Sequence, residues 1–183
     1  MLRMIFLAVI LLTLPAMSGC GTIYKASVDE RDVGTFVDDG RIESTVRARF
    51  VQDSTVKLRD VSVNSYRGHV YLVGEFEGEA QKLRAVKLTQ GVTGVGKVTV
   101  VPFPKRSDPT CGTQEELALY TKIKARLVQD RDIWSTQVDI KVVQCNVVMV
   151  GLVGSQREVG EILAHVNSVE GVRTVQNYIR VMR

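Results

Sequence analysis

The chain has 183 residues and a formal net charge of only +4, and 6% of its residues are aromatic. It contains no block of like charges of the kind that binds nucleic acid, and few aromatic side chains on which bases could stack. We therefore expect no nucleic-acid partner, and the length allows one medium domain or two small ones.

The chain begins with a charged start and a short apolar run. Arg3 supplies the positive charge, and the apolar stretch 4–16 is shorter than the roughly 20 residues that cross a bilayer. The segment 17–20, with the sequence MSGC, resembles the lipobox of bacterial lipoproteins. The resemblance implies cleavage after residue 19 and covalent lipid on Cys20, and Gly21 after the cysteine favours sorting to the outer membrane, facing the periplasm. The alternative is an ordinary secretory signal that leaves Cys20 as a free thiol.

The rest of the chain repeats itself at an offset of 77 residues, so that the segment 48–53 matches the segment 125–130. Two copies are too few for a solenoid, and we therefore expect two tandem small domains. The expected organisation is a signal peptide at 1–19, a lipidated tether at 20–37, a first domain at 38–101, a proline-rich linker at 102–113 and a second domain at 114–183.

The first copy predicts, in chain order, a helix, a β-hairpin, a second helix and a third strand. Ile42, Val46 and Phe50 recur at helical spacing, which marks the first helix. Two alternating segments flank the two-residue turn at 67–68, as in a hairpin. The segments expected for the three strands and the second helix are 61–66, 69–73, 95–101 and 78–90.

The second copy predicts the same order of elements. Leu119, Ile123 and Leu127 repeat the helical stripe. The expected strands are 138–143, 147–150 and 172–181, with a hairpin tip at 144–146 and a second helix at 156–167. Each copy is therefore expected to be an α/β unit of the α+β sandwich type, in which two helices cover one face of a three-stranded mixed sheet.

This pattern resembles the BON domain of exported bacterial envelope proteins. The resemblance lies in the helix that ends Ala-Arg-x-Val-Gln-Asp, the hairpin that closes with Val-Gly, and the segment Val-x-Gly-Val-x-x-Val before the last strand. Two such domains after a lipobox are similar to the dual-BON outer-membrane lipoproteins. The similarity implies a role in envelope integrity and binding of anionic phospholipid, chiefly through the second domain.

The first helix of the second copy and the loop after it are a candidate lipid-binding surface. Tryptophan suits the depth of the lipid headgroups, and lysine or arginine attracts anionic lipid. The matching helix of the first copy is less basic and has no aromatic residue outside its apolar stripe. The alternative is a solvated face with a partly buried tryptophan. The candidate residues are Tyr120, Lys122, Lys124, Arg126, Arg131 and Trp134.

The remaining cysteines and histidines suggest no catalytic or metal site. Cys111 and Cys145 could form a disulfide between the linker and the hairpin tip, or remain separate thiols. His69 and His165 fall at unrelated positions of the repeat and make no recognisable metal-ligand set with the cysteines. We therefore expect no enzyme, no metal and no cofactor besides the lipid. A periplasmic adaptor that binds a protein or peptidoglycan partner is the alternative function.

Overall fold

The computed structural model describes residues 33–105 and 110–182. The expected signal peptide, Cys20 and most of the expected tether lie outside these ranges. The first domain comprises the helices α3 (Val33–Gln52) and α4 (Glu79–Gln90) and the strands β1 (Val61–Tyr66), β2 (His69–Phe76) and β3 (Lys97–Pro104). The second comprises α5 (Thr113–Gln129), the 3-10 turn η1 (Ser135–Gln137), β4 (Val138–Val143), β5 (Asn146–Val153), α6 (Gln156–Asn167) and β6 (Thr174–Val181).

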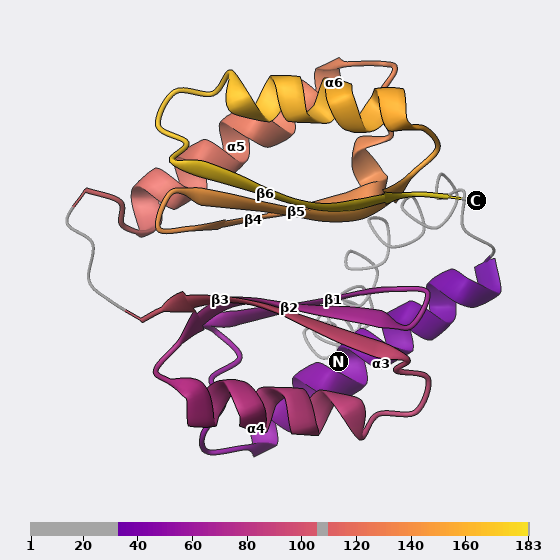
Figure 1. Ribbon diagram of the computed structural model, residues 1–183, viewed down its shortest axis with the longest axis vertical. Coiled ribbons are helices and arrows are strands. Elements are labelled where there is room, and N and C mark those ends of the chain that lie inside the picture. Colours follow the sequence, from indigo (N-terminus) through magenta and orange to yellow (C-terminus); the bar gives the residue numbers. More distant parts are fainter. Residues whose placement is uncertain (1–32, 106–109, 183) are drawn as a thin grey trace, which may run out of the picture.

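Each domain contains a three-stranded mixed sheet. The strand orders are β1-β2-β3 and β4-β5-β6, and the central strand is antiparallel to the first and parallel to the third. The antiparallel pair is the hairpin, and the intervening helix makes the crossover that a parallel neighbour requires. The predicted fold class is confirmed: two tandem α+β units with two helices each (Figure 1).

Each sheet buries one face against its own two helices. In the first domain Val46 and Phe50 of α3 pack with Leu72 of β2, and in the second Ile123 of α5 packs with Met149 of β5. These residues belong to the apolar stripes and alternating strands of the repeat. Two small cores of the expected kind therefore form, one in each copy.

Several element boundaries differ from those expected, and β3 continues to Pro104, inside the segment expected to be a linker. The first helix begins at Val33, inside the segment expected to be a tether, because residues 33–37 contain no proline that would stop it. The second hairpin has a two-residue turn rather than a three-residue tip, since Val143 pairs with Asn146 and only Gln144 and Cys145 lie between them.

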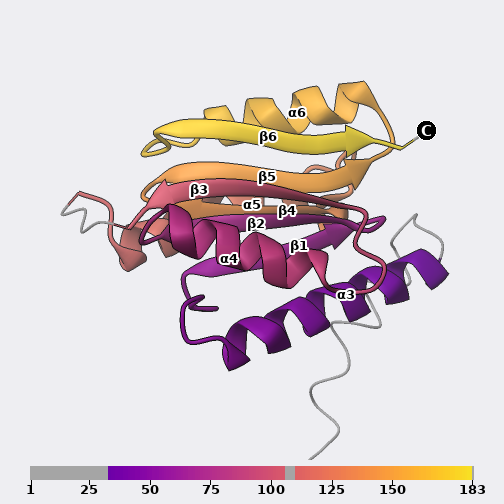
Figure 2. The ribbon, with the colours of Figure 1, turned by 60° about the horizontal axis from the view of Figure 1, so that its bottom comes forward.

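The other faces of the two sheets pack against each other. The molecule is therefore a four-layer stack in which the sheets are inside and the helices are outside (Figures 1 and 2). This intersheet interface brings together Tyr66, Tyr71, Val73, Val101 and Phe103 with Val143, Val148, Val150 and Leu152.

Polar contacts accompany the apolar ones across the intersheet interface. Asp139 of β4 accepts hydrogen bonds from the amide of Asn64 (3.0 Å) and from the hydroxyl of Tyr66, both on β1. The guanidinium of Arg180 donates to the carbonyl of Tyr66 (3.1 Å). Apolar packing and paired polar groups together fix the orientation of one domain on the other.

Candidate functional site

The outer side of α5 exposes large apolar side chains. Its buried stripe of Leu119, Ile123 and Leu127 faces the core of the second domain. Leu117 and Val128, outside this stripe, are 64% and 61% exposed, and Tyr120 is 40% exposed. In the described ranges, α5 therefore exposes three large apolar side chains, whereas α3 exposes two and α4 one.

The structure does not gather the six predicted residues into one patch. Residues two apart on a helix point about 200° apart, so Lys124 lies on the opposite side of α5 from Lys122 and Arg126. The ammonium group of Lys124 donates to the carbonyl of Ser135 (2.6 Å), just before β4. Arg126 instead donates to the hydroxyl of Ser168 at the end of α6.

Arg126 has a structural role that the first domain repeats. Its counterpart Arg49 donates to the carbonyls of Leu88 and Gly91, each at 2.9 Å, at the end of α4. In both domains the arginine of the Ala-Arg-x-Val-Gln-Asp motif therefore ties the first helix to the end of the second. We accordingly assign Arg126 to the fold rather than to the candidate surface.

Trp134 lies on a loop that is fixed to the second helix. The residue is 44% exposed, and its backbone N–H donates to the carboxylate of Glu158 (2.8 Å). The other carboxylate oxygen of Glu158 accepts from Gly154 (3.1 Å), while Ser155 caps α6 by accepting from the Glu158 N–H (3.2 Å). The loop is thus held at the start of α6 while the indole remains accessible.

Two of the predicted cations are available for a ligand. Lys122 and Arg131 are exposed, and among the residues that the structure describes their side chains make no hydrogen bond or ion pair. Lys124 is half-buried, and its contact with Ser135 places its charge beside the residue that follows Trp134. The candidate surface therefore reduces to Tyr120, Lys124, Arg131 and Trp134, because Lys122 points from the opposite side of α5.

The repeated aspartates of the motif serve local turns. Asp130 accepts from the N–H of Asp132 (3.0 Å) and pairs with His165 of α6 (2.7 Å), and the hydrogen bond from His165 lowers the pKa of Asp130. Asp53 accepts from the N–H of Thr55 (2.9 Å) and pairs with Arg84 of α4, whose hydrogen bond lowers the pKa of Asp53. Each carboxylate therefore ends the first helix and fastens it to the second.

His69 is enclosed in the intersheet interface. Its ring stacks on Tyr71 at a centroid distance of 4.1 Å, and its nitrogens contact the hydroxyls of Thr99 (2.8 Å) and Tyr71 (3.1 Å). Burial, with smaller contributions from Arg180 and Lys97, lowers the pKa of His69 from 6.5 to about 4. The imidazole is therefore neutral at physiological pH and acts as a packing group.

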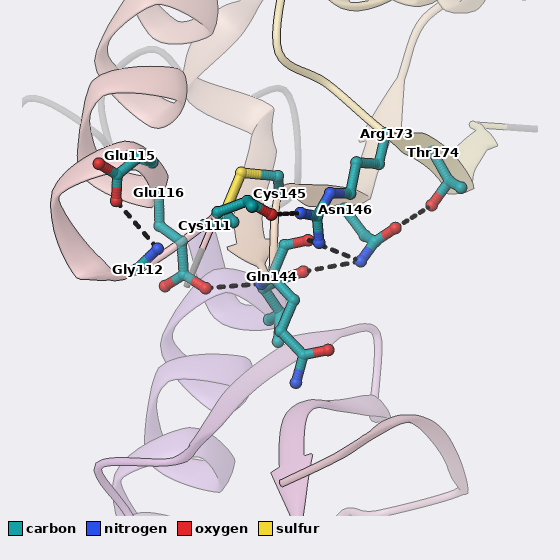
Figure 3. The surroundings of a disulfide bond; sticks show 11 residues. Cys111, Gly112, Glu115, Glu116, Gln144, Cys145, Asn146, Arg173 and Thr174 are labelled. Atoms are coloured by element: carbon teal, nitrogen blue, oxygen red, sulfur yellow. Dashed lines mark hydrogen bonds between the residues drawn. A yellow bond between two sulfur atoms is a disulfide. The ribbon is translucent and has the colours of Figure 1, made fainter. Parts of the chain in front are cut away.

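Cys111 and Cys145 form a disulfide that fastens the linker to the turn of the second hairpin (Figure 3). Their Cα atoms are 5.8 Å apart. The neighbouring Gln144 reaches the first domain, where its amide donates to the carboxylate of Glu75 (2.7 Å) and the carbonyl of Pro104 (2.8 Å). The cross-linked turn therefore also contacts the other domain.

The described residues were also compared with the requirements of a metal site, a pocket and a membrane span. No group of three or more His, Cys, Asp or Glu side chains within 33–105 and 110–182 could hold a metal ion. A hollow of about 670 Å³ beside the first hairpin turn is bordered by Asp38, Arg41, Arg67 and Thr93. In the same ranges, no helix is both long and apolar enough to cross a membrane.

The comparisons with known proteins identify the repeat. A family model described as the BON domain matches residues 38–101 and 116–183. Osmotically-inducible protein Y of Escherichia coli is 31% identical over 158 residues, which cover 85% of this chain and 79% of the relative. The outer membrane lipoprotein DolP of Haemophilus influenzae is 30% identical over 135 residues, or 72% and 68% of the two chains.

More distant similarities extend over much of the chain. The 21 kDa hemolysin of Actinobacillus pleuropneumoniae is 26% identical over 159 residues, which cover 84% of this chain and 80% of the relative. Among solved structures, the type III secretion protein CdsD of Chlamydia trachomatis aligns over 79% of this chain and 63% of its own length. Its TM-score of 0.33 and 14% identity are too low to support a comparison.

Proposed function

Because the chain belongs to the BON-domain family and carries the domain twice, we propose that it is a non-enzymatic lipoprotein of the outer membrane. Its lipid anchor would be Cys20, and its two-domain body would face the periplasm and support the integrity of the envelope. Two observations support this proposal: the lipobox-like segment 17–20 and the similarity to a relative named as an outer membrane lipoprotein.

We further propose that the second domain makes its own contact with anionic phospholipid. The observation that supports this is the accessible Trp134 on a fixed loop. Arg131 precedes Trp134 by three residues, and the ammonium group of Lys124 donates to the carbonyl of Ser135, the residue after it. An indole sits favourably at headgroup depth, and each nearby cation attracts anionic lipid with about 1 kcal/mol. The exposed Leu117 and Tyr120 would add apolar area to the contact.

Co-sedimentation with vesicles tests the second contact. Residues 21–183, which lack Cys20 and its lipid, are mixed with neutral and with anionic vesicles at low and at high salt. We expect binding to anionic vesicles that weakens as salt rises, because the charges are exposed and therefore screened. Trp134→Ala and Arg131→Glu should each reduce binding about fivefold or more, if each group contributes about 1 kcal/mol.

A charge reversal in the first domain provides the control. Lys87 is exposed on α4, so Lys87→Glu changes the net charge equally but should leave vesicle binding unchanged. Equal loss of binding in Lys87→Glu and Arg131→Glu would indicate a general charge effect and contradict a defined site. Absence of binding under every condition would favour the alternative, an adaptor whose partner is a protein or peptidoglycan.

A further inference from the structure

The outer edge of β1 is closed by two side chains of α3. The two-residue turn after β1 makes Val63 and Ser65 direct their backbone groups away from β2. The N–H of Ser65 donates to the carboxylate of Glu43 (2.8 Å), and the carbonyl of Val63 accepts from Arg47 (2.7 Å). Glu43 and Arg47 also pair with each other (3.2 Å), so they cover this edge, and the N–H of Ser65 and the C=O of Val63 are already bonded and are not available to a further strand.

The equivalent edge of β4 is open. Ile140 and Val142 correspond to Val63 and Ser65, but the positions of Glu43 and Arg47 are occupied by Tyr120 and Lys124. Lys124 turns to Ser135 instead, and along the described chain no side chain bonds the outward N–H and C=O groups of Ile140 or Val142. Ile140 is also partly exposed, whereas Val63 is completely buried.

The sequence of β4 is complementary to itself. Residues 138–142 read Val-Asp-Ile-Lys-Val. If two copies of this strand ran antiparallel about Ile140, each valine would face a valine and Asp139 would face Lys141 of the second copy. Opposite charges directly across an antiparallel pair stabilise it, and Lys141 has no ion-pair or hydrogen-bond partner among the described residues of its own chain.

An apolar stripe borders the same edge. In the first domain Glu43 reaches over the outer edge of β1, and Tyr120 occupies the same position in the second domain. The side of α5 that carries Tyr120 is therefore the side that overlooks the edge of β4. Leu117 and Val128 lie on this side of the helix and are both more than half exposed. Two strands paired edge to edge would bring the two α5 helices together and cover this surface.

We propose that the outer edge of β4 binds a second copy of this chain. The pairing is antiparallel and two-fold symmetric, centred on Ile140, and it joins the two second-domain sheets into one continuous sheet. The surface is isologous, since the same residues of each copy face one another. This association goes beyond the proposed anchoring and lipid binding.

Sedimentation equilibrium of residues 21–183 over a range of concentrations tests the proposal. We expect the wild type to be a dimer at high concentration. In a dimer of the Lys141→Asp variant, Asp139 of each copy would face the new aspartate of the other copy. This like-charge repulsion should raise the dissociation constant roughly tenfold or more. Ile140→Pro removes an outward N–H that takes no part in the β4–β5 ladder, so it should also give monomers while the circular dichroism spectrum is retained.

Lys87→Asp, on the far domain, is the matched charge control and should remain as dimeric as the wild type. A wild type that stays monomeric at all concentrations, or a Lys141→Asp variant that dimerises as tightly as the wild type, would overturn the proposal. Tyr120 and Lys124 border the edge of β4 and also belong to the candidate lipid-binding surface, so dimer formation and vesicle binding should exclude each other. Monomeric Lys141→Asp should therefore bind anionic vesicles at least as well as the wild type.

The vesicle assay separates this proposal from the proposed lipid contact. Dimers that bind no vesicles would overturn only the lipid contact, and monomers that bind vesicles would overturn only the pairing of β4.

Discussion

His69 couples the stability of the molecule to pH. Its pKa is lowered to about 4 in the folded chain, whereas the unfolded chain takes up the proton near pH 6.5. As the pH falls from 6.5 towards 4, the unfolded state therefore gains a proton that the folded state does not bind. The stability that the neutral ring provides is complete above pH 6.5 and is lost across this window.

We expect the free energy of unfolding to decrease by up to about 3 kcal/mol between pH 7 and pH 4 through this residue. His69→Gln should flatten the dependence in that window, because no imidazole remains to be protonated in the unfolded chain. Urea unfolding of both proteins at pH 7, 5.5 and 4.5 measures the effect. The same dependence on pH in both proteins would show that other groups are responsible.

Single residues also explain which parts of the candidate surface the sequence could reveal. The exposure of Trp134 agrees with its polar surroundings in the chain, but nothing in the sequence shows that Glu158, 24 residues away, holds its loop. The repeat itself did contain the signal that Arg126 is structural, since Arg49 occupies the same position in a copy with no proposed lipid site.

The helices and strands were largely predictable because the sequence pattern of each element occurs in both copies of the repeat. A helical stripe or a strand alternation that recurs 77 residues later is unlikely to arise by chance, and the order of elements was correct in both copies. Element ends were less predictable, because they depend on pairing. Asn146 joins β5 only because it lies opposite Val143, which the local sequence does not specify.

The second hairpin turn contains a residue in an unfavourable conformation. Cys145 has a φ of 59°, and the corresponding residue of the first turn is Gly68, with a φ of 71°. A side chain in the left-handed region costs about 1 kcal/mol relative to glycine. The disulfide to Cys111 therefore holds a cysteine where the backbone favours glycine.

A pair of substitutions separates the effect of the bond from that of the backbone. Cys111→Ser with Cys145→Ser should lower the free energy of unfolding by about 3–4 kcal/mol, the effect of opening a loop of this length. Cys111→Ser with Cys145→Gly should recover about 1 kcal/mol of this loss. Chemical denaturation measures both, and a glycine variant no more stable than the serine variant would contradict the explanation.

The association of the two sheets was the main feature that the sequence did not reveal. Alternation in β1 suggested one polar face, and the intersheet interface joins residues of the two domains that lie at least 40 positions apart in the chain, such as Phe103 and Val143. A signal was nevertheless present in the central strands. β5 is buried at every position but its first, as expected for a strand covered on both faces rather than on one.

The intersheet interface should make the two domains unfold together. Val148 is completely buried between the sheets, so Val148→Asp places an unpaired charge there and should cost about 2 kcal/mol or more. We expect one calorimetric transition in the wild type and two in this variant. Val51→Asp, at a position that is 70% exposed, is the control and should retain one transition.

The intersheet interface draws on equivalent positions of the two copies. Tyr66, Tyr71 and Val73 of the first domain correspond to Val143, Val148 and Val150 of the second, and all six lie in the contact. Such self-matching surfaces are typical of two-fold homodimers. Here the two halves share one polypeptide, so their encounter is intramolecular and dilution does not separate them. The two halves can therefore differ at their outer strands without loss of the contact, and they do: side chains of α3 cover the edge of β1, whereas Lys124 of α5 turns away from the edge of β4.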